Sequence, residues 1–472
     1  MKKAMLLLSI FSLSFAQENL EELKRQLEEQ RRLIRELEKK IEALEKAQKP
    51  EAKQEDKKEE KPIPADRTLQ LRSKYEERLK AFQISPFRQT AFLPDISLIV
   101  DTSFVGRNKK DKELGELKIP GLYHKHEHDK HGHGALNEKR GFNLNYAELF
   151  FYAPVDPYFD LYATIPFSEH GAEVEEAYAV TRGLPGGFQL KVGKFRSSFG
   201  RLNSQHPHAW DFATQPLVYK VFFGDDGLTE KGIQINWLAP TPFYLLLGAE
   251  VLQGENEQSF GTDGFKIGTV EVSETRKPNL YVGFVKTSFD VGNLSILTGL
   301  SYGTGHSRIY HKHEGEEHAF AGKTKLYGFD LTARYNLDSI RYISFQGEYI
   351  YKDSKGTGFE HDGSTLNTEE VKKKQGGFYS QLVFKFDKRW RAGIQYNLIN
   401  KNYVKKDGVK EDLPKNLPAY YAMLEFSPTE FSRIRLQAGQ NRAFYEGGRR
   451  KTVNEVILQF NFAIGAHGAH PF

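Results

Sequence analysis

The sequence has 472 residues and no cysteine, which excludes disulfide bonds, cysteine-ligated zinc and thiol nucleophiles. Long apolar runs are missing too, since none reaches the roughly 18 residues that a membrane-spanning helix needs. Charge of one sign is not in large excess: 67 Lys and Arg face 62 Asp and Glu, and a formal net charge of +5 does not indicate a nucleic-acid partner. What the chain has instead is aromatic side chains, 35 Phe and 23 Tyr, in a sequence of negative mean hydropathy. This combination is unusual for a soluble enzyme.

The N-terminus reads as a secretory signal peptide. Lys2 and Lys3 precede a short apolar run, and the small residues Ser14 and Ala16 stand before the expected cleavage site. We expect residues 1–16 to be removed and the mature chain to be exported. Gln17 follows the cut, which excludes a lipid anchor on an N-terminal thiol.

A heptad pattern follows the signal peptide. Residues 17–49 are predicted to form a coiled coil, because Leu and Ile recur at both seam positions through residues 20–44. The mixture of Leu and Ile does not decide between a dimer and a trimer, nor between self-association and another partner. Residues 50–67 form a charged, proline-containing linker, and residues 68–92 a short helical connector.

From about residue 93 the apolar pattern has a period of two. In 389–398 and in 431–441, apolar residues alternate with Arg, Gln, Asn and Gly. About 16 such segments are joined by short turns that tend to alternate with long connections near 106–140, 196–228, 254–277, 304–320, 353–372 and 402–416. Alternating connection lengths are typical of outer-membrane barrels. The predicted fold of residues 93–472 is therefore all-β, a transmembrane antiparallel β-barrel of about 16 strands preceded by the coiled coil.

This fold predicts a location and partners. We expect the barrel in the outer membrane of a Gram-negative bacterium, in contact with its lipid, and the coiled coil in the periplasm. The last strand ends on Phe472, which resembles the signal read by the barrel-assembly machinery.

Two histidine clusters fall in connections predicted to lie on the same, extracellular side. Imidazole is the commonest protein ligand for transition metals, and carboxylates can complete the coordination shell. Zinc leads as the expected ion, although copper usually binds such sites more tightly and nickel is also possible. Solvated loops with incidental metal affinity, or a pH sensor, remain open, and no cofactor is required. The candidate metal ligands are His124, His126, Glu127, His128, Asp129, His131, His133, His306, His311, His313 and His318.

The connection 196–228 joins the predicted strands five and six, and in 16-stranded porins that loop folds inward and narrows the channel. Such a fold would place Arg196, Arg201, His206, His208 and Asp211 at the constriction. A loop packed over the mouth through its aromatic residues is the alternative. The polar strand faces also direct a basic set toward the lumen, which would favour anions. That set is Lys191, Arg389, Arg391, Arg433 and Arg435.

Several words of the sequence carry a resemblance: "LPDIS" (93–97), "VEEAY" (174–178), "FGRLNSQHPHAWDF" (199–212), "PLVY" (216–219), "GLTEKGIQINWLAP" (227–240) and "AHGAHPF" (466–472). They resemble a group of Gram-negative outer-membrane barrels that are often labelled zinc-regulated outer-membrane receptors or porins. The resemblance implies a barrel and a link to zinc supply. The chain differs from TonB-dependent receptors, because it lacks an N-terminal plug and is too short for 22 strands. A coiled coil before a 16-stranded barrel is instead similar to trimeric phosphate-selective porins, which implies a homotrimer through residues 20–44.

The leading hypothesis is a porin-like channel whose extracellular histidines capture a divalent transition metal for passive uptake. One alternative is an anion-selective or general porin with incidental metal binding. Another is a structural anchor that ties the membrane to the cell wall through the coiled coil. No arrangement of nucleophile, histidine and acid stands out, so we do not expect an enzyme.

Overall fold

The computed structural model describes residues 94–122, 136–169, 171–313 and 316–465. The predicted signal peptide, coiled coil, linker and connector, the histidines 124–133 and Phe472 lie outside the described residues. Sixteen long strands run through the described part: β1 (Asp95–Arg107), β2 (Gly141–Pro154), β3 (Phe159–Ser168), β5 (Glu176–Thr181), β6 (Phe188–Arg196), β7 (Thr229–Leu238), β8 (Tyr244–Leu252), β11 (Leu280–Val291), β12 (Leu294–His313), β13 (Glu316–Asn336), β14 (Tyr342–His361), β15 (Leu366–Lys385), β16 (Trp390–Lys406), β18 (Leu417–Thr429), β19 (Ser432–Asn441) and β22 (Val453–Gly465).

The remaining elements are short. They are the strands β4 (Gly171–Ala172), β9 (Phe265–Ile267), β10 (Val270–Val272), β17 (Val409–Lys410), β20 (Tyr445–Glu446) and β21 (Arg449–Arg450), the α-helices α3 (Asp111–Gly115) and α4 (Leu217–Phe223), and the 3-10 turns η2 (Pro185–Gly187), η3 (Leu202–Ser204) and η4 (Pro207–Ala209). No helix within the described ranges is long and apolar enough to cross a membrane.

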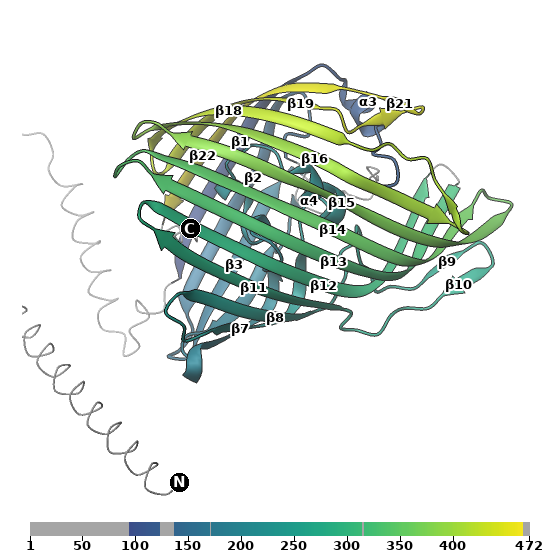
Figure 1. The fold of residues 1–472 in the computed structure, drawn as a ribbon, viewed down its shortest axis with the longest axis horizontal. Coiled ribbons are helices and arrows are strands. Elements are labelled where there is room, and N and C mark those ends of the chain that lie inside the picture. The colour runs from purple at the N-terminus through teal and green to yellow at the C-terminus, as the bar shows by residue number, and fades with distance from the viewer. Residues whose placement is uncertain (1–93, 123–135, 170, 314–315, 466–472) are drawn as a thin grey trace, which may run out of the picture. The chain divides into compact units, whose positions relative to one another are not determined.

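The long strands form one closed antiparallel barrel (Figure 1). Each pairs with the next long strand along the chain, and β1 pairs with β22 from Ser97 opposite Gly465 to Arg107 opposite Glu455. Closure leaves the barrel without a free edge, so each of its sixteen long strands has hydrogen-bond partners on both sides. The prediction of an antiparallel barrel of about 16 strands is confirmed.

The barrel turns its polar face inward and its apolar face outward. On β19, Arg435 is fully buried while the neighbouring Leu436 is 48% exposed. On β16, Gln395 is buried and Ile394 is exposed, and on β22 the same contrast separates Asn461 from Phe462. A soluble barrel has the opposite polarity, so this exterior fits an apolar surrounding.

One side of the barrel is much taller than the other. Strands β12 to β15 have 20 or 21 residues each, whereas β5 has six and β6 has nine. Since roughly 9–11 residues span a bilayer, the tall strands extend well beyond that thickness. The prediction of long loops at 304–320 and 353–372 is therefore wrong, because these residues continue the strand pairing. At the tip of β12, for example, Lys312 lies opposite Glu317 and forms an ion pair of 2.9 Å.

The lumen is occupied by residues 197–228, the luminal segment, which connects β6 to β7. Its aromatic residues Phe199, Tyr219, Phe222 and Phe223 are buried together with wall residues of several strands. Residues on the connection between β1 and β2, such as Ile119, join the same apolar core. Two segments that are far apart in the sequence thus pack together inside the barrel, although the inner face of the barrel wall is polar.

Candidate metal centre

The luminal segment is fixed to the barrel wall by hydrogen bonds. The carboxylate of Glu348 on β14 accepts the backbone N–H groups of Arg201 and Leu202, both at 2.8 Å, and the hydroxyl of Tyr219 at 2.7 Å. On β19, Arg435 donates to the Trp210 carbonyl oxygen at 2.7 Å. The residues between these anchors, including His206 and His208, are therefore held in place.

Proline gives the histidines their local geometry. A residue before proline favours extended backbone, and His206 has φ −71° and ψ 154°. Pro207 then opens the turn η4, in which Trp210 N–H donates to the Pro207 carbonyl at 3.1 Å. The turn stacks the rings of His206 and His208, whose centroids lie 5.6 Å apart.

Three wall carboxylates face these rings. Glu148 lies on β2, Glu175 directly precedes β5, and Glu176 begins it. Both segments pair with β3, where Glu148 lies opposite Pro166 and Glu176 lies opposite Thr164. The acids therefore lie at about the same level along the barrel wall. All three are buried.

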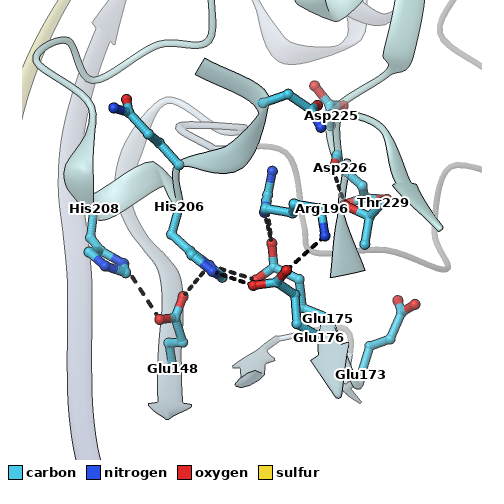
Figure 2. Close-up of polar contacts among 12 residues, drawn as sticks. Glu148, Glu173, Glu175, Glu176, Arg196, His206, His208, Asp225, Asp226 and Thr229 are labelled. Carbon is cyan, nitrogen blue, oxygen red and sulfur yellow. Dashed lines mark hydrogen bonds and ion pairs between the residues drawn. The ribbon is translucent and has the colours of Figure 1, made fainter. Parts of the chain in front are cut away.

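Figure 2 shows the acids converging on His206. Its Nδ1 lies 3.3 Å from Glu175 Oε2 and 3.6 Å from Glu148 Oε2, and its Nε2 lies 2.8 Å from Glu176 Oε2. His208 Nδ1 lies 3.5 Å from the other oxygen of Glu148. Arg196, at the end of β6, donates to Glu175 Oε1 through Nε at 2.7 Å and through a second guanidinium nitrogen.

The contacts at Nδ1 of His206 suit a metal better than strong hydrogen bonds, whereas Nε2 makes an ordinary hydrogen bond with Glu176. The distances around Nδ1 exceed the usual hydrogen-bond length. In a tetrahedral zinc site with bonds of about 2.1 Å, neighbouring ligand atoms lie about 3.4 Å apart. The ligand atoms of Glu148, Glu175 and His206 all lie within 4.8 Å of one another, the one such group found in the described part of the chain.

The charge of the cluster favours a cation. With neutral imidazoles, three carboxylates and Arg196 leave two negative charges, which a divalent ion would neutralise. Burial lowers the pKa of His206, but the carboxylates of Glu175 and Glu148 outweigh burial and hold that pKa well above its usual value. Proton and metal therefore compete for the same nitrogen. A cavity of about 170 Å³, lined in part by Glu148, Glu175 and Arg196, gives small ions room beside the site.

The other residues predicted at the constriction serve the anchoring of the segment. Asp211 accepts from Arg391 at 2.6 Å and from Gln381 at 2.7 Å. Arg201 meets Glu348 through its backbone N–H.

The basic residues predicted to line the lumen fall into two groups. Arg391, Arg433 and Arg435 converge on Glu425, at 2.6, 3.6 and 2.8 Å. Lys191 lies over the ring of Tyr178, 4.7 Å from its centroid, and Arg389 sits in the exposed turn before β16. Most of these charges are thus paired or shielded.

The second histidine cluster lies on strands and not on a loop. His311 on β12 is directly opposite His318 on β13, and both line a cavity of about 530 Å³. His306 is exposed, and its Nδ1 lies 3.2 Å from Asn279 Oδ1. His313 ends β12. His306 and the pair His311 and His318 therefore do not form one site.

Sequence reasoning missed the three wall acids. Glu175 and Glu176 stand in "VEEAY", a word that resembles other barrels, and Glu148 interrupts the apolar run of β2 on its polar face. Nothing in the sequence showed that these acids meet His206, because the meeting depends on the inward path of the luminal segment.

The fold and site thus define a closed barrel with an apolar exterior and a buried carboxylate–histidine cluster in its lumen. No protein-family model matches the chain. A protein of Aquifex aeolicus (strain VF5), described as an uncharacterized protein, is 69% identical over 476 residues, covering 100% of both chains. The chain belongs to the same family as that protein.

Solved structures give more distant likenesses. OmpT of Vibrio cholerae with loop L8 deleted has a TM-score of 0.45 at 10% identity, over 79% of this chain and 100% of that one. The outer-membrane channel DcaP of Acinetobacter baumannii scores 0.45 at 11% identity, over 79% and 96%. An anion-selective porin from Comamonas acidovorans scores 0.43 at 12% identity, over 79% and 99%.

Proposed function

We propose that the protein is a porin-like outer-membrane channel through which a divalent transition-metal ion, zinc before copper or nickel, passes by way of the lumen. The observation that carries this proposal is the cluster of Glu148, Glu175 and His206, with His208 beside it. A buried site of net negative charge lowers the energy of a dehydrated cation where a neutral lumen would exclude it. The apolar exterior of the barrel supports the membrane location.

The histidines of 124–133 are proposed to gather ions on the extracellular side before they reach the lumen. Residues 20–44 are proposed to hold a homotrimer, and Phe472 to be recognised during barrel assembly. An anion-selective porin is the weaker candidate, because the lumen arginines Arg391, Arg433 and Arg435 already share Glu425. Paired arginines offer less to a passing anion.

The test is zinc entry into liposomes that contain the purified full chain and a zinc-sensitive dye. Glu148→Gln and His206→Gln should each lower zinc affinity and zinc entry by about tenfold or more, since each removes one ligand. The matched controls are Asp101→Asn, a buried carboxylate on β1 whose hydrogen bonds go to the wall residues Asn145, Gln459 and Asn461, and His306→Gln, an exposed histidine. Liposomes that contain either control variant should take up zinc as fast as liposomes with the unmodified chain.

Circular dichroism must show an intact barrel in every variant. Zinc entry that is unchanged in Glu148→Gln and His206→Gln would refute the luminal site. Current that is carried by anions and is indifferent to zinc would favour the anion-selective porin.

A further inference from the structure

A second cavity, of about 530 Å³, lies against the tall wall of the barrel. It is lined by β12 to β16 and by residues of the two inward connections 118–122 and 257–259. None of its lining residues belongs to the carboxylate–histidine cluster, so a ligand in this cavity would bind independently of the metal site.

Two lysines face this cavity from neighbouring strands. Lys352 on β14 lies opposite Gln375 on β15, and Lys373 lies opposite Ser354. The two lysines are therefore diagonal neighbours on the inner face of one strand pair, about 7–8 Å apart at their backbones.

The side chain of Lys352 is buried, with 8% of the residue exposed. Its Nζ donates to the carbonyl oxygen of Gln258 at 2.8 Å and to Ser259 Oγ at 3.2 Å. An ammonium group has three N–H donors, so these two bonds leave one. The Nζ of Lys373, which is half-buried, lies over the ring of Phe320, 5.3 Å from its centroid. Within the described ranges, neither lysine has a carboxylate at ion-pair distance.

Three of the five glutamates that line the cavity gather around a third lysine instead. Lys406 Nζ lies 2.7 Å from Glu360, 2.8 Å from Glu369 and 3.3 Å from Glu411. Glu369 and Glu411, which line the same cavity as Lys373, are thus already engaged by Lys406. Two neighbouring amines withdrawn from water favour their neutral forms unless a counter-charge is present, and a bound anion would supply that counter-charge.

The rest of the lining indicates the kind of anion. Phe320, Val371 and Val404 form a buried apolar cluster beside the lysines. A small inorganic anion would leave this apolar surface without a partner, whereas an aromatic or aliphatic body would cover it. The acids around Lys406 would in addition repel a second negative charge on the ligand.

We propose that this cavity binds a small organic monocarboxylate. The carboxylate would accept hydrogen bonds from Lys352 and Lys373, and its apolar body would rest against Phe320, Val371 and Val404. The protein would then hold a second, chemically different ligand near the end of the barrel that carries β9 and β10 (Figure 1).

The test is titration calorimetry of the full chain, folded in detergent, with benzoate as the probe. Lys352→Met and Lys373→Met should each weaken benzoate binding by about tenfold or more, the loss expected for one charged hydrogen bond. Lys355→Met is the matched control, because Lys355 lies on the same strand as Lys352 but is exposed and pairs with Glu370 at 3.1 Å. It should bind benzoate like the unmodified chain.

Two further ligands separate the contributions that the charge and the apolar body of the ligand make to binding. Benzyl alcohol, which has the ring but no charge, and inorganic phosphate, which has charge but no ring, should both bind more weakly than benzoate. Phosphate binding tighter than benzoate would overturn the assignment of an organic ligand. Absence of benzoate binding, or equal loss in Lys355→Met, would overturn the site itself. If Lys352→Met fails to fold, Lys352→Arg should keep benzoate binding, and Lys373→Met still decides the outcome.

Discussion

Removing the carboxylate of Glu348 should release the luminal segment from the wall. This carboxylate accepts four hydrogen bonds: the backbone N–H groups of Arg201 and Leu202, the hydroxyl of Tyr219, and the hydroxyl of Tyr379 at 2.6 Å. In Glu348→Ala the tyrosines can turn to other partners, but the two backbone donors are left buried. Each unsatisfied donor costs about 1–3 kcal/mol, so the inserted arrangement should lose about 2–6 kcal/mol. Even the lower value corresponds to roughly a thirtyfold larger population of the released segment.

Single-channel recording in planar bilayers measures this release. Glu348→Ala should increase the conductance or the open time, and added protease should cut within residues 197–228 faster than in the unmodified chain. Glu348→Gln should show a smaller effect, because its amide oxygen still accepts two of the four donors. The control is Asp353→Ala, an acid on the same strand that is not buried. Unchanged conductance and unchanged protection in Glu348→Ala would show that the apolar core around Phe199 and Phe222 holds the segment without the carboxylate.

Two other changes give separable results. Arg435→Met removes a fully buried guanidinium that donates hydrogen bonds to Glu425, Gln459 and the Trp210 carbonyl oxygen. The free energy of unfolding in detergent should therefore fall by about 3 kcal/mol. The control Arg389→Met, at an exposed position, should leave that free energy unchanged. Equal stability of the two variants would contradict the role given to Arg435. Replacement of the five histidines between 124 and 133 by alanine should slow zinc entry at low external zinc but leave the affinity of the luminal site unchanged. A loss of luminal affinity would place those histidines in the site itself.

The barrel was predictable because strand alternation and connection lengths are local signals. Ile394 beside Gln395 and Leu436 beside Arg435 already indicate a wall with two different faces. The tips of β12 and β13 were not predictable in this way, since the polar stretch from His306 to His318 suits a loop by composition. Pairing with the neighbouring strand decides its structure. Likewise His206 was singled out by its own sequence word, whereas its partners Glu148 and Glu175 were identified only when the inward path of the luminal segment was known.

The metal site and the Glu348 anchor act on the same equilibrium. His206 lies between residues 201 and 202, which are bound to Glu348, and Trp210, which is bound to Arg435, so it reaches Glu148 and Glu175 only while the segment is inserted. A ligand that binds one of two states has its apparent dissociation constant divided by the fraction of that state. Zinc affinity should therefore stay unchanged in Glu348→Ala as long as the inserted state predominates, and should weaken once the released state does. Conversely, zinc should suppress the added conductance of Glu348→Ala but not that of Glu348→Ala combined with His206→Gln. Suppression of equal size in both variants would show that zinc acts elsewhere in the barrel.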